Sequence, residues 1–205
     1  METIEYKLES IIKKRRRGKI IFAGDFSTLG GSEAVFKALQ RLQKSGLLLR
    51  VAHGIYYYPK MNTFKYSDEK YEYPSIDEIA HQIAKRDKIR IVPTGAHALN
   101  VLGLSTQVVM NVVFITDGAP RNIKVGNGKG ILFKHTSEVR RLAFKSKLLM
   151  IIDSAMREIG DGKVRPHELE IIKGKLSYIT QKELDTDIDL MPIWIRDTIL
   201  KLWNS

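Results

Sequence analysis

The apolar positions in the N-terminal part of the chain are spaced first as in helices and then as in strands. In IEYKLESIIKK they recur every three to four residues, which predicts an amphipathic helix over residues 4–14 that Gly18 stops. KIIFAGDF is typical of a short strand running into Asp25 as a helix cap, and FSTL allows only a short helix. Gly30 and Gly31 are expected to break that helix.

A longer amphipathic helix and a hairpin follow the two glycines. Ser32 is expected to cap this helix and Gly46 to end it. Its apolar stripe comprises Val35, Ala38, Leu39 and Leu42, and the residues largely outside the stripe are Lys37, Gln40, Arg41 and Lys44. LLLRVAHGIYYY predicts two short strands around a turn at His53-Gly54. The resulting order of helix, strand, short helix, helix and two-stranded hairpin is that of a winged helix-turn-helix.

The remaining sequence predicts a second domain. Residues 61–74 are polar with interspersed aromatics and end at a proline, which indicates a connector. We therefore expect a winged-helix domain over residues 1–60 and a mixed α/β domain over residues 75–205, whose end is helical. The expected fold class is α+β.

Helix and strand patterns alternate in the first part of this second domain. Ser75 and Glu78 form a capping-box pattern for a helix that runs to about Arg86. KIRIVPTG and VVMNVVFITDG are typical of strands, GAHALNVLGL of a short helix, and NIKVGNGKGILFKH of a hairpin turning at Asn127-Gly128. Three helical patterns follow, in SEVRRLAFKSKLLMIIDSAMREIG, PHELEIIKGKL and PIWIRDTILKLW.

Basic residues are concentrated in the predicted winged helix. Of a formal net charge of +11, residues 1–62 contribute 12 lysines and arginines against 5 acids, and the other 143 residues contribute 22 against 18. Such a field favours a polyanion, either nucleic acid or an anionic membrane surface, and its placement favours nucleic acid. The absence of cysteine excludes disulfides and thiolate metal sites. METIEYKLES lacks the apolar segment of a signal peptide, and no apolar run has the length of a membrane helix.

Nine side chains of the winged helix are candidates for contacts with double-stranded DNA. The small residues that begin the second helix would let its N-terminal end approach a base edge or phosphate closely. The candidates are Ser32 and Glu33 for bases, Lys37 and Arg41 for phosphates, Arg50 and His53 on the wing, and Arg15, Arg16 and Arg17 for further phosphate contacts. The alternative is a core helix with a solvated basic face.

No pattern predicts catalysis, a metal or a cofactor. GNGKG at residues 126–130 lacks the spacing of a phosphate-binding loop and is expected to be a turn. His167-Glu168 begins a zinc-protease-like pattern, but residue 171 is isoleucine, and the histidines of the chain have no metal-ligand spacing. Asp117 ends a β run at which a nuclease would need a further acid on the next strand, and NIKVGNGKGILFK has none. We expect Asp117 to cap a turn.

Three motifs resemble those of the AbiEi-type antitoxin family, the transcriptional regulators of abortive-infection (type IV) toxin–antitoxin pairs. They are R-x-x-x-G-I-Y at Arg50 to Tyr56, P-T-G-A-x-A-L-N-x-L-G-L-S-T-Q at Pro93 to Gln107, and V-x-x-T-D-G ending at Gly118. The resemblance covers nearly the whole chain, is strongest from Gly46 to Asp117, and fades in the last sixty or so residues.

The resemblance implies a cytoplasmic, non-enzymatic repressor without cofactors, which binds its own promoter and autoregulates its operon. It also implies that the second domain counteracts a nucleotidyltransferase-like toxin without forming a stable complex. On this chain the DNA-reading positions would be Ser32, Lys37, Arg41, Arg50 and His53. No motif specifies the antitoxic residues; the basic side chains considered for this role are Arg121, Lys124, Arg140 and Arg141.

Two other classes of function remain open at the level of sequence. One is a nuclease-like enzyme in which Asp117 holds a metal ion. The other is a protein-interaction module that docks through the last helix around Trp194 and Trp203, although tryptophans at helical spacing usually pack inward.

Overall fold

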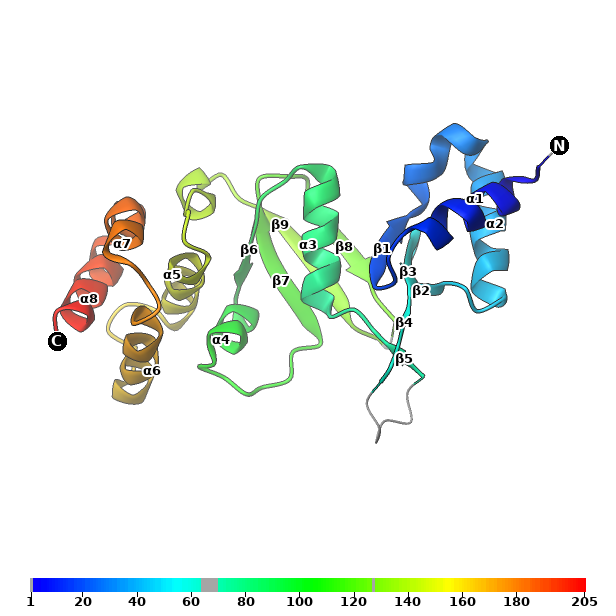
Figure 1. The fold of residues 1–205 in the computed structure, drawn as a ribbon. Helices are drawn as coiled ribbons and strands as arrows, with labels where there is room; N and C mark the ends of the chain where they lie inside the picture. The colour runs from blue at the N-terminus through cyan, green and yellow to red at the C-terminus, as the bar shows by residue number, and fades with distance from the viewer. Residues whose placement is uncertain (1, 64–69, 127) are drawn as a thin grey trace. The chain divides into compact units, whose positions relative to one another are not determined.

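The computed structural model describes residues 2–63, 70–126 and 128–205, and its contacts divide the chain into two units (Figure 1). The N-terminal unit comprises Met1–Ile83 and Ile123–Lys129, and the C-terminal unit comprises Ala84–Asn122 and Gly130–Ser205. The mixture of helices and sheets confirms the expected α+β class.

The units differ from the predicted division at 1–60, 61–74 and 75–205. The segment 123–129, expected in the second domain, belongs to the N-terminal unit, and the backbone N–H of Gly126 donates to the carbonyl of Val51 at 3.1 Å. This pairing joins residues far apart in the sequence, so a linear division at the connector could not include it.

The N-terminal unit begins with two helices that flank a strand and a 3₁₀ helix. In chain order its elements are α1 (Ile4–Lys14), β1 (Lys19–Phe22), η1 (Ala23–Leu29), α2 (Ser32–Lys44), β2 (Leu49–Ala52), β3 (Ile55–Tyr58), β4 (Lys60–Met61), β5 (Tyr71–Glu72) and most of α3 (Ile76–Asp87). The strands β4 and β5 pair with each other, β4 across the predicted boundary at residue 60 and β5 within the predicted connector, and residues 64–69 between them lie outside the described residues.

The helix ends show where local sequence rules held and where they failed. Gly46 has a φ of +78° after α2, and the N–H of Leu47 donates to the carbonyl of Leu42 at 3.0 Å, a Schellman-type ending that confirms the predicted stop. The predicted start of α2 was wrong by one residue, because Ser32 is the first helical residue and the cap position of the helix is Gly31. Gly18 does not stop α1, which ends at Lys14 because Arg15 is already extended.

Asp25 is also not a helix cap. It lies in the first turn of η1, whose cap position is Phe22, and no side chain caps that helix. The carboxylate of Asp25 instead lies 3.9 Å from the guanidinium of Arg15. The capping box of α3 is confirmed: the N–H of Ser75 donates to the Glu78 carboxylate at 3.2 Å, and the N–H of Glu78 donates to the Ser75 hydroxyl at 3.1 Å.

A three-stranded antiparallel sheet in the order β1-β3-β2 closes the N-terminal unit (Figure 1). β2 and β3 form the predicted hairpin, in which Gly54 takes a φ of +68° at the turn. The apolar faces of the helices and sheet meet in one core, which comprises Leu8, Ile12, Ile21, Ala23, Phe26, Val35, Ala38, Leu39, Leu42, Leu48, Tyr56 and Tyr58. All four residues of the predicted stripe of α2 belong to this core.

The C-terminal unit combines a mixed sheet with a group of helices (Figure 1). Its elements are β6 (Ile91–Thr94), α4 (Ala96–Leu102), β7 (Asn111–Thr116), β8 (Arg121–Lys124, which reaches the N-terminal unit), β9 (Gly130–His135), η2 (Val139–Leu142), α5 (Lys147–Ile159), α6 (Pro166–Leu176), α7 (Gln181–Asp187), η3 (Ile188–Leu190) and α8 (Ile193–Trp203). The strand order is β6-β7-β9-β8, with β6 antiparallel and β9 parallel to β7. The predicted turn residue Asn127 lies outside the described residues.

The long helical pattern after β9 is divided, and a short helix was missed. The pattern SEVRRLAFKSKLLMIIDSAMREIG forms η2 and then α5, because the chain turns between them at a side chain from much later in the sequence. The buried carboxylate of Asp187 accepts from the N–H of Lys145 at 3.0 Å and from that of Ser146 at 2.7 Å, which satisfies groups that begin α5. Asp187 ends α7, a helix that the sequence pattern did not reveal.

Candidate nucleic-acid interface

The first turns of α2 present polar side chains on the face opposite its core stripe. Ser32 and Glu33 are exposed in the first turn, and Lys37 follows one turn later on the same side. The Lys37 ammonium lies 2.7 Å from the Glu33 carboxylate, and the two side chains are 62% and 81% exposed. A pair this open to water contributes only about 0.3–0.5 kcal/mol, so an incoming phosphate can compete for Lys37.

Arg41 lies further along α2 and is attached to a different helix. Its Nη1 donates to the Glu5 carboxylate of α1 at 2.8 Å, although the arginine side chain is 62% exposed. Arg41 therefore ties the two helices together while remaining accessible to solvent. It is a candidate phosphate ligand only when it exchanges this partner.

The hairpin turn carries Arg50 and His53 outward, beside the start of α2. The Nη2 of Arg50 lies 3.4 Å from the Nδ1 of His53, and both side chains are exposed. The His53 ring is 5.7 Å from the ring of Phe36, centroid to centroid. Because Phe36 belongs to α2, this ring contact joins the hairpin turn to the helix that carries Ser32 and Lys37.

Phe36 is a positioning residue that the sequence analysis missed. It is half-buried, lies outside the apolar stripe of α2, and comes within 3.6 Å of the place where a side chain at Gly54 would begin. The signal was present in the sequence, since an aromatic residue beside the stripe needs a partner of its own. That partner, the turn at His53-Gly54, is visible only in the folded hairpin.

Burial and a neighbouring charge act in opposite directions on the pKa of Tyr56 in β3. Burial raises the pKa of the Tyr56 hydroxyl, and the positive charge of Arg50 offsets part of this rise. Tyr56 is 1% exposed and belongs to the core. It lies in β3 opposite Arg50 of β2.

The three consecutive arginines after α1 point to three different environments. Arg15 lies 3.9 Å from Asp25 and over the ring of Phe26 at 5.4 Å. Arg17 donates to the carbonyl of Pro59 at 3.0 Å and lies over the ring of Tyr58 at 4.8 Å. Arg16 is exposed and makes no hydrogen bond or ion pair within residues 2–63, 70–126 and 128–205. Only Arg16 is therefore free to bind a phosphate without losing an intramolecular contact.

The register of the sheet separates Arg17 from the hairpin turn. Lys19 of β1 pairs with Tyr58 at one end of β3, and Phe22 pairs with Ile55 at the other end, next to the hairpin turn. Four residues of strand span about 13 Å. The contact of Phe36 with His53 thus joins the helix that carries Ser32, Glu33 and Lys37 to the hairpin that carries Arg50 and His53. Arg17 lies at the other end of the sheet, at Tyr58 and Pro59, whereas Arg15 reaches Asp25 and Phe26 of η1.

The carboxylate of Asp117, the candidate nuclease residue, is paired with an arginine. Its two carboxylate oxygens accept from the backbone N–H and the Nε of Arg90, both at 2.8 Å. Desolvation raises the pKa of Asp117, but the bonds from Arg90 outweigh it and the pKa is lowered. The expected turn-capping role was wrong, because the hydroxyl of Thr116 accepts from the N–H of Gly118 instead. Among the described residues no group of three histidines or acids is arranged to hold a metal ion.

Basic side chains of the C-terminal unit are mostly tied to its own framework. Arg121 donates to Asp87 at 2.5 Å, and Arg140 donates to the carbonyl of Asp189 at 2.5 Å. Arg141 is half-buried, and desolvation lowers its pKa, as does the neighbouring charge of Arg157. Lys124 is exposed on β8. These four side chains are the ones considered for antitoxicity. Within the described part of the chain, no interaction joins any two of them.

The chain belongs to DUF6088, a family of unknown function whose profile matches residues 7–188. This match spans both units, so the family is defined by the two together. No curated protein matches the chain. In the part of the chain that the structure describes, no helix combines the length and apolarity needed to cross a membrane.

Proposed function

We propose that this protein is a DNA-binding transcriptional repressor whose N-terminal unit is a winged helix-turn-helix. The observation that carries the proposal is the contact between Phe36 and His53, which gathers the outward residues of α2 and of the hairpin on one side of the unit. In this proposal α2 is the recognition helix, and the hairpin of β2 and β3 is the wing. The sheet order β1-β3-β2 behind α2 supports that assignment.

The chemistry of the gathered residues supports double-stranded DNA as the partner. Lys37 and Arg50 bind phosphates, and Ser32 lies at the N-terminal end of α2, the end with which recognition helices meet base edges. Glu33 accepts from cytosine in this arrangement and holds Lys37 until DNA replaces it. Arg16 adds a phosphate contact beyond the wing, which requires the DNA to follow the sheet to its far end.

We further propose that the repressor is the antitoxin of a type IV, AbiE-like pair and regulates its own operon in the cytoplasm. This part of the proposal rests on the three motifs, of which one forms the wing, one runs through β6 and α4, and one ends β7. The toxin would be a nucleotidyltransferase-like protein that the C-terminal unit counteracts without a stable complex.

Gel shifts against the DNA upstream of the gene, across a salt series, test DNA binding. Lys37→Ala and Arg50→Ala each weaken binding at any sequence and reduce the salt slope by about 0.9 for one lost phosphate contact. Ser32→Ala changes the preference among operator variants more than the salt slope. Lys182→Ala, an exposed lysine of α7, is the matched control and leaves both quantities unchanged. Binding that does not depend on salt contradicts the proposal.

Coexpression tests the antitoxin role separately. A neighbouring nucleotidyltransferase-like gene is expected to arrest growth when induced alone, and growth should resume when residues 1–205 are coexpressed. The Lys37→Ala variant should still restore growth from a constant promoter, since it affects repression only. Failure to restore growth contradicts the antitoxin role and leaves the repressor role standing.

A further inference from the structure

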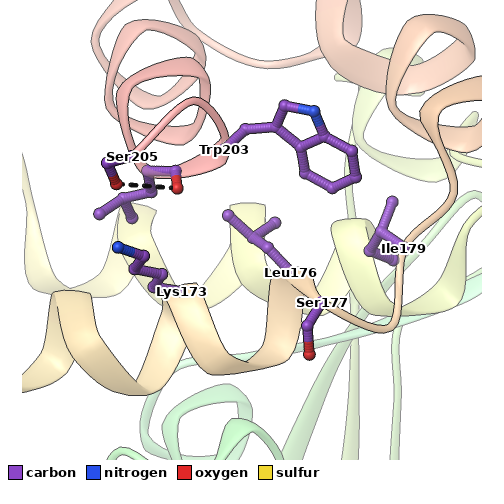
Figure 2. Close-up of a pocket in the computed structure, with 7 residues that line it drawn as sticks. Lys173, Leu176, Ser177, Ile179, Trp203 and Ser205 are labelled. Atoms are coloured by element: carbon purple, nitrogen blue, oxygen red, sulfur yellow. Dashed lines mark hydrogen bonds between the residues drawn. The ribbon is translucent and has the colours of Figure 1, made fainter.

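A small cavity opens between α6 and α8 of the C-terminal unit (Figure 2). Its volume is about 270 Å³, and its walls include Lys173 and Leu176 of α6, Ile179 after it, and Leu202 and Trp203 of α8. Nothing in the proposed DNA contacts uses this cavity, because all of its lining residues lie in the C-terminal unit.

The apolar part of the cavity is built on the core of the unit. Leu176 and Ile179 are only 2% and 7% exposed and belong to the main core of the unit, so they form a fixed floor. The indole Nε1 of Trp203 donates to Gln181 at 3.1 Å, which holds the ring in place above that floor. Figure 2 shows the Trp203 ring on the side of Ile179, with Leu176 between it and Lys173. A flat aromatic wall with a polar tether is typical of ligand pockets.

The polar part of the cavity offers a single cation. The hydroxyl of Ser177 donates to the carbonyl of Gly174 at 2.8 Å, and that of Ser205 donates to the carbonyl of Leu202 at 3.1 Å, so both hydroxyl protons are used. Lys173 is the charged side chain of the lining, and within the described ranges no carboxylate, including the terminal one of Ser205 that also borders the cavity, forms an ion pair with it. Its ammonium lies at the end of the cavity away from the Trp203 ring (Figure 2).

We propose that this cavity binds a small amphipathic carboxylate, with its carboxylate on Lys173 and its apolar body between Leu176 and Trp203. An acid group complements the unpaired ammonium, and an apolar chain or single aromatic ring covers the indole and the leucine. The cavity is slightly smaller than the roughly 300–1,000 Å³ of ordinary ligand sites, which limits the ligand to about ten non-hydrogen atoms. Octanoate has this size and serves as the probe.

The two indole N–H signals in a ¹⁵N-correlated NMR spectrum make the test specific. Trp203 lines the cavity, whereas Trp194 lies nine residues earlier on α8, or about 13 Å along the helix. Trp203→Phe assigns the two signals. Titration with sodium octanoate is expected to shift the Trp203 signal saturably and to leave the Trp194 signal in place.

Matched variants and a neutral ligand distinguish binding through the carboxylate from nonspecific apolar binding. Lys173→Gln is expected to weaken octanoate binding about tenfold, and Lys175→Gln, two residues later on α6, leaves it unchanged. Octanamide should bind wild type about tenfold more weakly than octanoate. The backbone spectrum of each variant verifies its fold.

Three results overturn the proposal. They are no saturable shift of the Trp203 signal, equal octanoate affinity in wild type and Lys173→Gln, and equal affinity for octanoate and octanamide. Gel shifts of the same variants keep this site distinct from the proposed repressor function, since loss of either activity leaves the other measurable.

Discussion

The two units contain arginines whose ion pairs differ in how deeply they are buried. In the N-terminal unit Arg16 is exposed and Arg41 keeps a 62% exposed side chain even while paired. In the C-terminal unit Arg157 is only 25% exposed and donates to Asp153, whose side chain is 3% exposed, at 2.8 Å. Exposed pairs exchange their partners at little cost, whereas a buried pair loses several kcal/mol when one member is removed.

This difference shows that a basic residue indicates a binding surface only when its partners are known. Arg90 and Arg121 of the C-terminal unit hold Asp117 and Asp87 in place, so they join elements of the fold. Arg16 and Arg17 are neighbours in the sequence, yet one is free within the described structure and the other is attached to Pro59 and Tyr58. Four measurements test the contrast.

The largest effect is expected at the buried ion pair of the C-terminal unit. Asp153→Ala should lower the free energy of unfolding by about 3 kcal/mol, because it leaves Arg157 without its partner in a partly buried place. Burial raises the pKa of Asp153, and the bond from Arg157 offsets part of this rise. Urea unfolding at neutral pH measures the change.

Glu138→Ala is the control for this pair, since Glu138 is 61% exposed and lies 3.8 Å from Arg157. It should change the free energy of unfolding by less than about 0.5 kcal/mol. Equal losses in the two variants would mean that burial does not distinguish them.

A smaller and pH-dependent effect is expected at the start of α6. The Glu168 carboxylate accepts from the Arg165 backbone N–H at 2.8 Å and from its guanidinium at 2.6 Å. The bond from the Arg165 side chain lowers the pKa of Glu168 from its ordinary value of 4.5. The contribution of this carboxylate to the free energy of unfolding is therefore fully present above pH 4.5. It is lost as the pH falls through the lowered pKa.

Glu168→Ala should cost about 1 kcal/mol at pH 7, as the loss of a helix cap does. Glu168→Gln keeps an acceptor but removes the titration, so its stability should depend less on pH below 4.5 than that of wild type. Urea midpoints measured between pH 3 and pH 7 provide the comparison. Parallel curves for wild type and Glu168→Gln would contradict the role of this carboxylate.

Arg17→Ala tests the attached arginine of the N-terminal unit. Loss of the bond to Pro59 and of the stacking on Tyr58 should lower the free energy of unfolding by about 1 kcal/mol. The salt slope of DNA binding should hardly change, because this guanidinium is already engaged. Thermal unfolding and the gel-shift series measure the two quantities on one protein sample.

Arg16→Ala should do the reverse and have the smallest effect on folding. The free energy of unfolding should stay within about 0.5 kcal/mol of wild type, as at other exposed sites. The salt slope of DNA binding should fall by about 0.9 if Arg16 binds one phosphate. If Arg16→Ala and Arg17→Ala give the same pair of results, the two environments do not differ in function.

Local patterns predicted much of the N-terminal unit correctly. The spacing of apolar residues placed α1 and all four core residues of α2, and Gly46 and the Ser75 capping box marked helix ends by short-range chemistry. These rules act within a few residues, so the sequence contains all of their participants. Where a partner lay far away the rules failed: the division of the long pattern into η2 and α5 depends on Asp187, some forty residues later.

The candidate site shows the same limit. Its residue types and the basic excess are readable from the chain alone, because charge and helix faces are local properties. Which of those side chains meet depends on β1 pairing with β3 and on Phe36 reaching the hairpin turn. Such long-range contacts place Arg17 at the end of the sheet away from the hairpin turn and attach it to a residue 42 positions away. Long-range packing alone selects such partners, since nothing in the spacing of an arginine specifies the carbonyl or ring that it will find.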